Sequence, residues 1–131
     1  MKKILFLFTF MAFSLLGICQ SFNHTASNPT GAILNTSSDT MNFSTAKSYS
    51  VVAIQPVVTK ATGTMAGKSY LYTSLDGVNY VINDSLVLGN VTTNSNIWVK
   101  ANPPYVYWRI VTGGATTVTG TTSAKFVGKN P

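Results

Sequence analysis

Short runs of β-forming residues, each separated from the next by turn residues, fill the chain from about Met41 to Val127. Thr, Val, Tyr and Gly dominate these runs, and no apolar residues recur with the period of an amphipathic helix. We therefore predict an all-β fold over residues 41–131, an antiparallel β-sandwich or jelly-roll-like domain of about seven or eight strands. The predicted strands are Tyr49–Val58, Lys68–Leu75, Asn79–Asn83, Ser85–Leu88, Ile97–Lys100, Tyr105–Thr112 and Thr116–Val127.

Turn chemistry and proline refine this prediction. Asp76-Gly77 is the strongest hairpin signal in the chain, and the Asp76 side chain should cap the turn backbone. Asp39 and Asp84, each followed by a hydroxyl residue, are predicted to be loop residues of the same kind. Pro56 requires an edge position or a bulge, because proline has no N–H to donate to a β-ladder.

Alternation along the strands also predicts the core, because successive side chains point to opposite faces of a sheet. The apolar phase should be buried between the two sheets. It contains Val52, Ile54, Leu71, Leu75, Val106, Trp108 and Ile110.

Residues 1–19 are predicted to be a secretory signal peptide. Lys2 and Lys3 precede an apolar run, and small residues at Gly17 and Cys19 fit cleavage between Cys19 and Gln20. The protein would then reach the periplasm, the cell surface or the medium with no cysteine left for a disulfide. The alternative is a retained membrane anchor, although the run is shorter than the ~20 residues that cross a bilayer. Only that alternative brings the protein to a membrane.

Residues 20–40 are rich in Ser, Thr and Asn and lack strand alternation apart from Ala32–Leu34. They predict a spacer or an irregular arm, in which the short apolar patch could dock on the domain.

The side chains that most often act as acids, bases, nucleophiles or metal ligands are few: three Asp and no Glu, one His and one Cys. No paired-carboxylate, nucleophile or zinc-binding motif can be assembled from them, so we predict no enzyme, no metal site and no cofactor. The nine Lys and Arg residues are scattered along the chain rather than clustered. This distribution does not fit a nucleic-acid partner.

Tyrosines occupy the second face of two predicted strands. Tyr70 and Tyr72 share one face, and Tyr105, Tyr107 and Arg109 share another. The five side chains could form an aromatic shelf that stacks on a sugar ring or holds a partner subunit. The alternative is cross-strand tyrosine pairing that stiffens a half-exposed sheet.

The final strand predicts an assembly edge. Thr116–Phe126 is long and nearly uncharged, with Lys125 alone to discourage a neighbouring strand. Thr117, Thr119 and Thr121 would mark the edge that accepts a strand from another subunit. Alternatively, Gly120 kinks this strand and residues 21–39 cover its edge, which leaves a monomer.

Several motifs carry a family resemblance. They are Gly63-Thr-Met-Ala-Gly67, Tyr70-Leu-Tyr-Thr-Ser-Leu-Asp-Gly-Val-Asn-Tyr80, Ile97-Trp98, Tyr105-Val-Tyr-Trp-Arg-Ile110 and the Gly/Thr-rich last strand. With them, residues 63–128 resemble small β-sandwich proteins encoded by tailed phages and prophages of Bacteroidota. The resemblance implies a non-catalytic protein of the virion surface, tail or head. A signal peptide departs from that pattern and favours an exported host relative or a phage with a membrane.

Two functional hypotheses follow. The first is a non-enzymatic structural module, exported or on a virion, whose partners are its own copies or the subunits of a larger assembly. The second is a small carbohydrate-binding module that uses the tyrosine shelf to bind a surface glycan.

Overall fold

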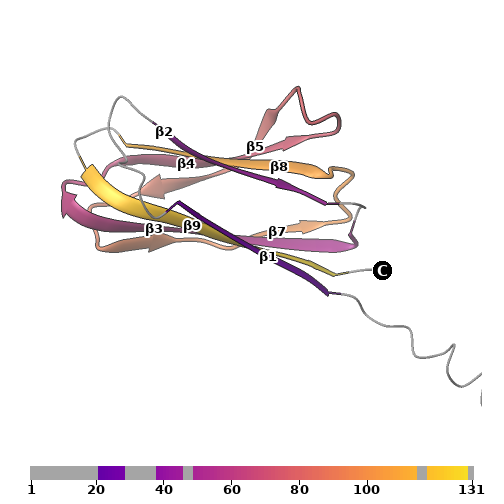
Figure 1. Cartoon of the computed structure of the whole chain (residues 1–131), viewed down its shortest axis with the longest axis horizontal. Helices are drawn as coiled ribbons and strands as arrows, with labels where there is room; N and C mark the ends of the chain where they lie inside the picture. Colours follow the sequence, from indigo (N-terminus) through magenta and orange to yellow (C-terminus); the bar gives the residue numbers. More distant parts are fainter. Residues whose placement is uncertain (1–20, 29–37, 46–48, 115–117, 130–131) are drawn as a thin grey trace, which may run out of the picture.

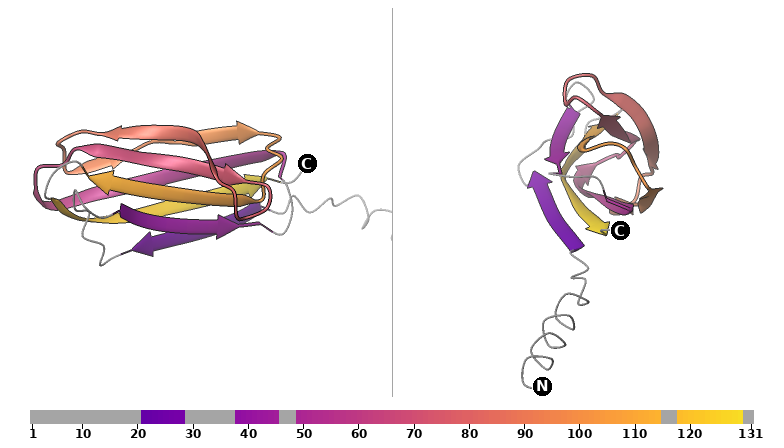
Figure 2. Two further views of the ribbon diagram at one scale, coloured as in Figure 1. Left: turned by 90° about the horizontal axis from the view of Figure 1, so that it is seen from above. Right: turned by 90° about the vertical axis from the view of Figure 1, so that its right-hand side faces the viewer.

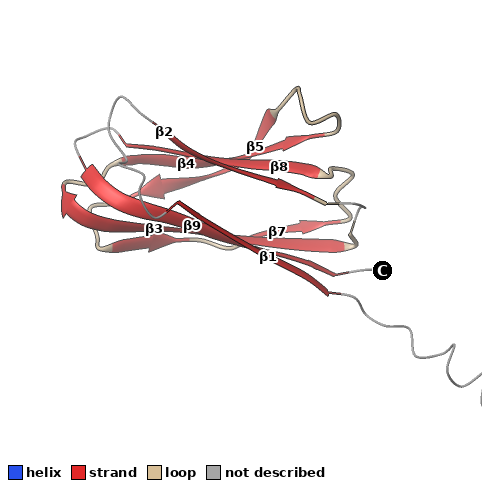
Figure 3. Cartoon of the chain, in the orientation of Figure 1, coloured by secondary structure: helices blue, strands red, loops and turns tan. Residues whose placement is uncertain are grey.

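The protein is a sandwich of two antiparallel sheets, seen side-on in Figure 1 and from two further directions in Figure 2. The computed structural model describes residues 21–28, 38–45, 49–114 and 118–129, the first of these ranges by its backbone alone. Within these ranges the chain consists of strands and loops without a helix (Figure 3), so none is present there to cross a membrane. The predicted all-β sandwich is confirmed. The predicted signal peptide lies outside the described residues.

Nine strands make up the described part of the two sheets. One sheet, called here the β3 sheet, has the order β1-β9-β3-β6, and β7 also pairs with β3. It contains β1 (Ser21–Asn28), β3 (Val51–Gly63), β6 (Thr93–Ser95), β7 (Trp98–Ala101) and β9 (Val118–Lys129). The other, the β8 sheet, has the order β2-β8-β4-β5. It contains β2 (Ser38–Ser44), β4 (Gly67–Ser74), β5 (Val81–Leu88) and β8 (Tyr107–Gly114).

The core lies between the inner faces of the sheets and is richest in aromatic side chains at one end. Trp108 is fully buried and meets Phe126 edge-to-face at 5.6 Å between ring centroids. Phe126 in turn stacks on Phe43 at 5.9 Å. This aromatic cluster also includes Met41, Tyr49, Val52, Ile54, Leu71, Trp98, Ile110 and Ala124. A smaller cluster of Val58, Met65, Leu88 and Val118 continues the core.

Five of the seven predicted core residues are buried, and two are not. Val52, Ile54, Leu71, Trp108 and Ile110 are buried. Leu75 is 67% exposed, because β4 ends at Ser74 and alternation no longer orients the residues beyond it. Val106 is half-buried, since it precedes the first residue of β8.

The prediction that residues 20–40 lack a strand is wrong for part of that stretch. Ser21–Asn28 forms β1, which pairs antiparallel with β9 from Thr122 to Lys129. Ser38 opens β2, which pairs with β8. A polar sequence can adopt a strand where a neighbour already offers a row of backbone hydrogen-bonding groups. The apolar patch at 32–34 lies outside the described residues.

This arrangement corrects the predicted assembly edge for the second part of β9 only. β9 lies between β1 and β3 along Thr122–Lys129, so that stretch is interior to the sheet. The alternative, in which residues near the N-terminus cover the edge of β9, therefore holds for Thr122–Lys129. Thr119 and Thr121 pair with Thr62 and Thr59 of β3 on one side, and no described strand pairs with them on the other, so an assembly edge there stays a prediction. Thr117 lies outside the described residues.

Pro56 is accommodated in a third way, neither at an edge nor in a bulge. One side of β3 pairs with β9 along its whole length. On the other side, β7 pairs with β3 up to Ile54 and β6 pairs with it from Val57. Pro56 falls in the gap between these two strands, where the described residues place no ladder bond for a proline N–H to make.

Two aspartates predicted in loops lie in strands instead. Asp39 is in β2 and is buried. Asp84 is in β5, at a register shift, and its carboxylate accepts a hydrogen bond from Lys100 Nζ of β7 at 2.8 Å. This ion pair joins the two sheets along one side of the sandwich.

Candidate functional site

The outer face of the β8 sheet carries the tyrosines, and Arg109 lies at its centre. Antiparallel register places Arg109 of β8 beside Asn42 of β2 and Tyr72 of β4. Arg109 Nε donates a hydrogen bond to Asn42 Oδ1 at 2.8 Å. Its guanidinium lies 3.8 Å from the ring centroid of Tyr80, in cation–π contact.

Tyr80 is a member of this face that the sequence did not indicate. We define the tyrosine face as Tyr70, Tyr72, Tyr80, Tyr107 and Arg109. Tyr70 and Tyr72 contact each other with ring centroids 6.2 Å apart and planes tilted by 57°. The one signal for Tyr80 was its place four residues after Asp76, on the return side of the hairpin. That spacing brings its ring back over the neighbouring strands.

Tyr105 does not belong to the shelf, which is a correction to the prediction. β8 begins at Tyr107, so the alternation that would group Tyr105 with Tyr107 and Arg109 does not extend to it. Its ring instead meets Trp108 edge-to-face at 5.9 Å and packs against the aromatic cluster. Tyr105 also lines a depression of about 240 Å³ together with Leu75, Asp76 and Val81.

A shallow hollow of about 380 Å³ lies on the same outer face. Tyr70, Tyr72 and Val111 form its apolar side, and Ser38 and Lys68 add polar groups. Glycines form its floor at the end of the strands, where β4 and β8 approach closely. A Cβ at Gly67 would overlap the carbonyl oxygen of Gly113, and Gly67 has a φ of +128°.

The β4–β5 hairpin is tightly organised around Asp76, as the sequence predicted. Asp76 Oδ1 accepts hydrogen bonds from the backbone N–H of Val78 and of Asn79, both at 2.8 Å, and from Ser74 Oγ at 2.7 Å. Asn79 Nδ2 donates to Oδ2 at 2.7 Å. Backbone donors, followed by these side chains, hold the pKa of Asp76 well below its usual range. The carboxylate is therefore charged at neutral pH.

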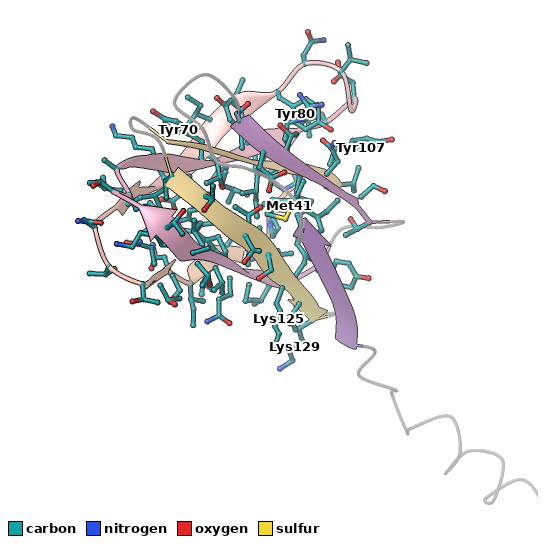
Figure 4. The ribbon with its side chains drawn as sticks, turned by 60° about the vertical axis from the view of Figure 1, so that its left-hand side comes forward. Met41, Tyr70, Tyr80, Tyr107, Lys125 and Lys129 are labelled. Carbon is teal, nitrogen blue, oxygen red and sulfur yellow. The ribbon has the colours of Figure 1, made fainter. Side chains whose placement is uncertain are left out.

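The outer face of the β3 sheet is aliphatic and basic rather than aromatic. We call it the valine–lysine face. Its apolar members are Val51, Ala53, Ile97, Val99 and Val127, and its exposed cations are Lys125 and Lys129. The three aspartates of the chain all lie elsewhere, in β2, the hairpin and β5. Figure 4 shows Lys125 and Lys129 on the opposite side of the molecule from Tyr80 and Tyr107.

The chemistry of the outer faces follows from the side chains that they expose. The described residues contain no group of three or more His, Cys, Asp or Glu side chains that could hold a metal ion. Asp84 and Lys100 are paired with each other. What the described outer faces offer is flat aromatic rings, aliphatic side chains and a few cations, which recognise other surfaces by stacking and burial.

Comparison of the sequence with protein-family models and with curated proteins finds no match. Similar folds do occur among solved structures. The chain resembles the PBSX exported protein XepA at a TM-score of 0.59 and 9% identity over 82% of its length, which corresponds to 38% of that chain. It resembles the Yersinia pseudotuberculosis-derived mitogen at a TM-score of 0.50 and 6% identity, covering 85% of this chain and 86% of the other.

A subunit of the disulfide-linked pili that form Bacillus endospore appendages is also similar. The TM-score is 0.49 and the identity 15%, over 88% of this chain and 93% of that one. At these identities the comparisons with XepA and the mitogen establish a shared sandwich fold. They carry over no partner, ligand or activity.

Proposed function

We propose that the protein is a non-enzymatic, exported structural module that takes part in a larger assembly through the outer faces of its sheets. The observation that carries this proposal is the distribution of exposed aliphatic side chains. They gather over the β4–β5 hairpin and the first residues of β5, and over the valine–lysine face. Their members include Leu75, Val78, Val81, Ile82, Ile97, Val99 and Val127.

Such gathering is unusual on a protein that works alone, because contiguous exposed apolar surface is mostly reserved for interaction sites. Only 9% of the residues are charged, so few charged side chains must lose their hydration when two such surfaces meet. The partner would be a second copy or another subunit of the same particle.

We also propose how the protein is exported and where it acts. The apolar N-terminal run supports export with cleavage between Cys19 and Gln20, and the resemblance over residues 63–128 supports a virion or cell-surface location. Intact-mass spectrometry of protein recovered outside the cytoplasm should give a chain that begins at Gln20. A full-length chain would overturn cleavage and favour the anchored alternative.

Sedimentation velocity over a concentration series to tens of micromolar tests the structural role. Association that grows with concentration, or recovery of the protein within a particle purified from its own cell, is the expected result. A monomer at every concentration that is also absent from every particle fraction would overturn the proposal.

A carbohydrate-binding module is the second candidate, and the hollow beside Tyr70 and Tyr72 favours it. Aromatic rings with nearby hydroxyl and ammonium groups can stack on a sugar and bind its hydroxyls. A glycan array comparing the wild type with Tyr72→Ala tests this role. Loss of specific binding in the variant would support it, and an array with no specific signal would exclude the sugars tested.

A further inference from the structure

The β4–β5 hairpin forms a rigid apolar knob on one side of the molecule. Figure 1 shows the hairpin rising above the β8 sheet, away from the β3 sheet. Its most exposed members are Val78, at 78%, and Leu75, at 67%. The hydrogen bonds to Asp76 fix the loop between them, so little conformational freedom remains to be lost on binding. The Asp76 carboxylate lies beside this apolar tip.

The valine–lysine face carries a matching hollow of about 140 Å³ on the opposite side. Ala53, Ile97 and Val127 line it, and Lys125 lies at its rim. The hollow exists because Ala53 is small while its cross-strand neighbours, Val127 on β9 and Val99 on β7, are larger. None of the three Asp side chains lies on this face, which carries the cations Lys125 and Lys129.

We propose that the hairpin knob of one copy docks in the hollow of the valine–lysine face of the next copy. This rests on the proposed assembly role and names the contact that performs it. Val78 would fill the hollow above Ala53, and the Asp76 carboxylate would approach the Lys125 ammonium. This contact would combine a fit between apolar surfaces with an attraction between opposite charges.

The contact is head-to-tail, because the knob and the hollow are different surfaces of one chain. The hairpin belongs to the β8 sheet and the hollow is lined by residues of the outer face of the β3 sheet, so each added copy presents a fresh knob and a fresh hollow. A heterologous contact of this geometry leads to an open stack rather than a closed dimer, unless the rotation between copies closes a ring.

Matched substitutions test this contact, with association read by sedimentation velocity. Ala53→Leu fills the hollow, and Thr59→Leu adds the same side chain further along the same face of β3, at another half-buried position. Val78→Ser removes the apolar tip of the knob. Val87→Ser makes the same change at a similarly exposed position near the end of β5, away from the hairpin loop. We expect roughly tenfold weaker association for Ala53→Leu and for Val78→Ser, as burial of one aliphatic side chain implies. The two controls should associate as the wild type does.

Disulfide trapping supplies a readout that does not depend on affinity. In the chain that begins at Gln20, which has no cysteine of its own, a mixture of Val78→Cys and Ala53→Cys proteins should form a mixed dimer on mild oxidation. Val78→Cys mixed with Thr59→Cys should form far less of it, because the two thiols would lie too far apart. Circular dichroism and a thermal midpoint for each variant confirm that it is folded.

Association that persists unchanged in Ala53→Leu and Val78→Ser, with no selective mixed dimer, would overturn this contact. The proposed structural role would survive that result, because the protein would still associate through another surface. A wild-type protein that stays monomeric and gives no selective mixed dimer would overturn the contact as well. The proposed role would then depend on recovery from a native particle.

Discussion

The two outer faces of the sandwich differ in the contacts that their side chains make with one another. On the tyrosine face, Arg109 is held by Asn42 and covered by the ring of Tyr80. On the valine–lysine face, Ile97, Val99 and Val127 are exposed, and the side chains of Lys125 and Lys129 have no hydrogen bond or ion pair with another described residue. Residue type alone therefore does not identify a binding surface. Tyrosine and arginine are favoured at interfaces, yet here part of that set is already used within the molecule.

Both sheets pack on one aromatic core, and we expect the largest loss of folding stability from a substitution in that core. Trp108→Ala should lower the free energy of unfolding by about 3–5 kcal/mol, because it leaves a large cavity between the sheets. Urea unfolding followed by fluorescence of the remaining Trp98 and by circular dichroism measures this loss. Unfolding at the wild-type midpoint would contradict the description of Trp108 as the centre of the core.

A matched pair of substitutions tests the difference between the faces directly. Arg109→Ala removes one hydrogen bond and one cation–π contact, and should cost about 1–2 kcal/mol of folding stability. Lys125→Ala removes a solvent-exposed cation and should change stability by less than about 0.5 kcal/mol. Equal losses of folding stability in the two variants, measured by denaturant unfolding, would contradict the difference between the two faces.

Two carboxylates make the stability of the protein depend on pH in the acid range: Asp76 in the hairpin and Asp84 at the side of the sandwich. Burial raises the pKa of Asp84, but the hydrogen bond from Lys100, the Ser85 N–H and the Lys100 charge together lower it further, so its net pKa is below the ordinary value. Asp76 is lowered as well. A carboxyl with a depressed folded-state pKa stabilises the fold above its unfolded-state pKa, and this stabilisation is lost as the pH falls through the folded-state value.

Stability should therefore be unaffected by these two groups from pH 7 to about pH 5, and should decline below about pH 4. Asp84→Asn should reduce that decline by a small amount, about 0.5 kcal/mol, because its ion pair is partly exposed. Thermal midpoints measured from pH 7 to pH 2 check this. A decline of the same size in wild type and Asp84→Asn would show that the ion pair contributes nothing.

Much of the fold could be predicted from alternation and turn chemistry. The hairpin at Asp76-Gly77 and the inward phase of Trp108 and Ile110 are local properties, and the structure confirms them. Strand ends were less predictable, because Leu75, Tyr105 and Val106 lie just beyond strands whose limits depend on pairing with neighbours.

Long-range pairing explains what the sequence could not indicate. β1 is a strand because β9 offers it a ladder, which no feature of Ser21–Asn28 itself reveals. Likewise, Tyr80 and Arg109 meet across the sheet, 29 residues apart, and the hollow at Ala53 depends on the register of three strands. These features belong to the fold and not to any one segment of the chain.

Hydrogen–deuterium exchange at low and high protein concentration tests most directly which face the protein uses. Backbone amides in residues 75–79, 97–101 and 125–129 should become more protected as concentration rises, whereas those in 68–72 and 107–111 should not change. Protection that is independent of concentration, or that grows on the tyrosine face alone, would contradict the claim that the protein assembles through its unsatisfied aliphatic surfaces.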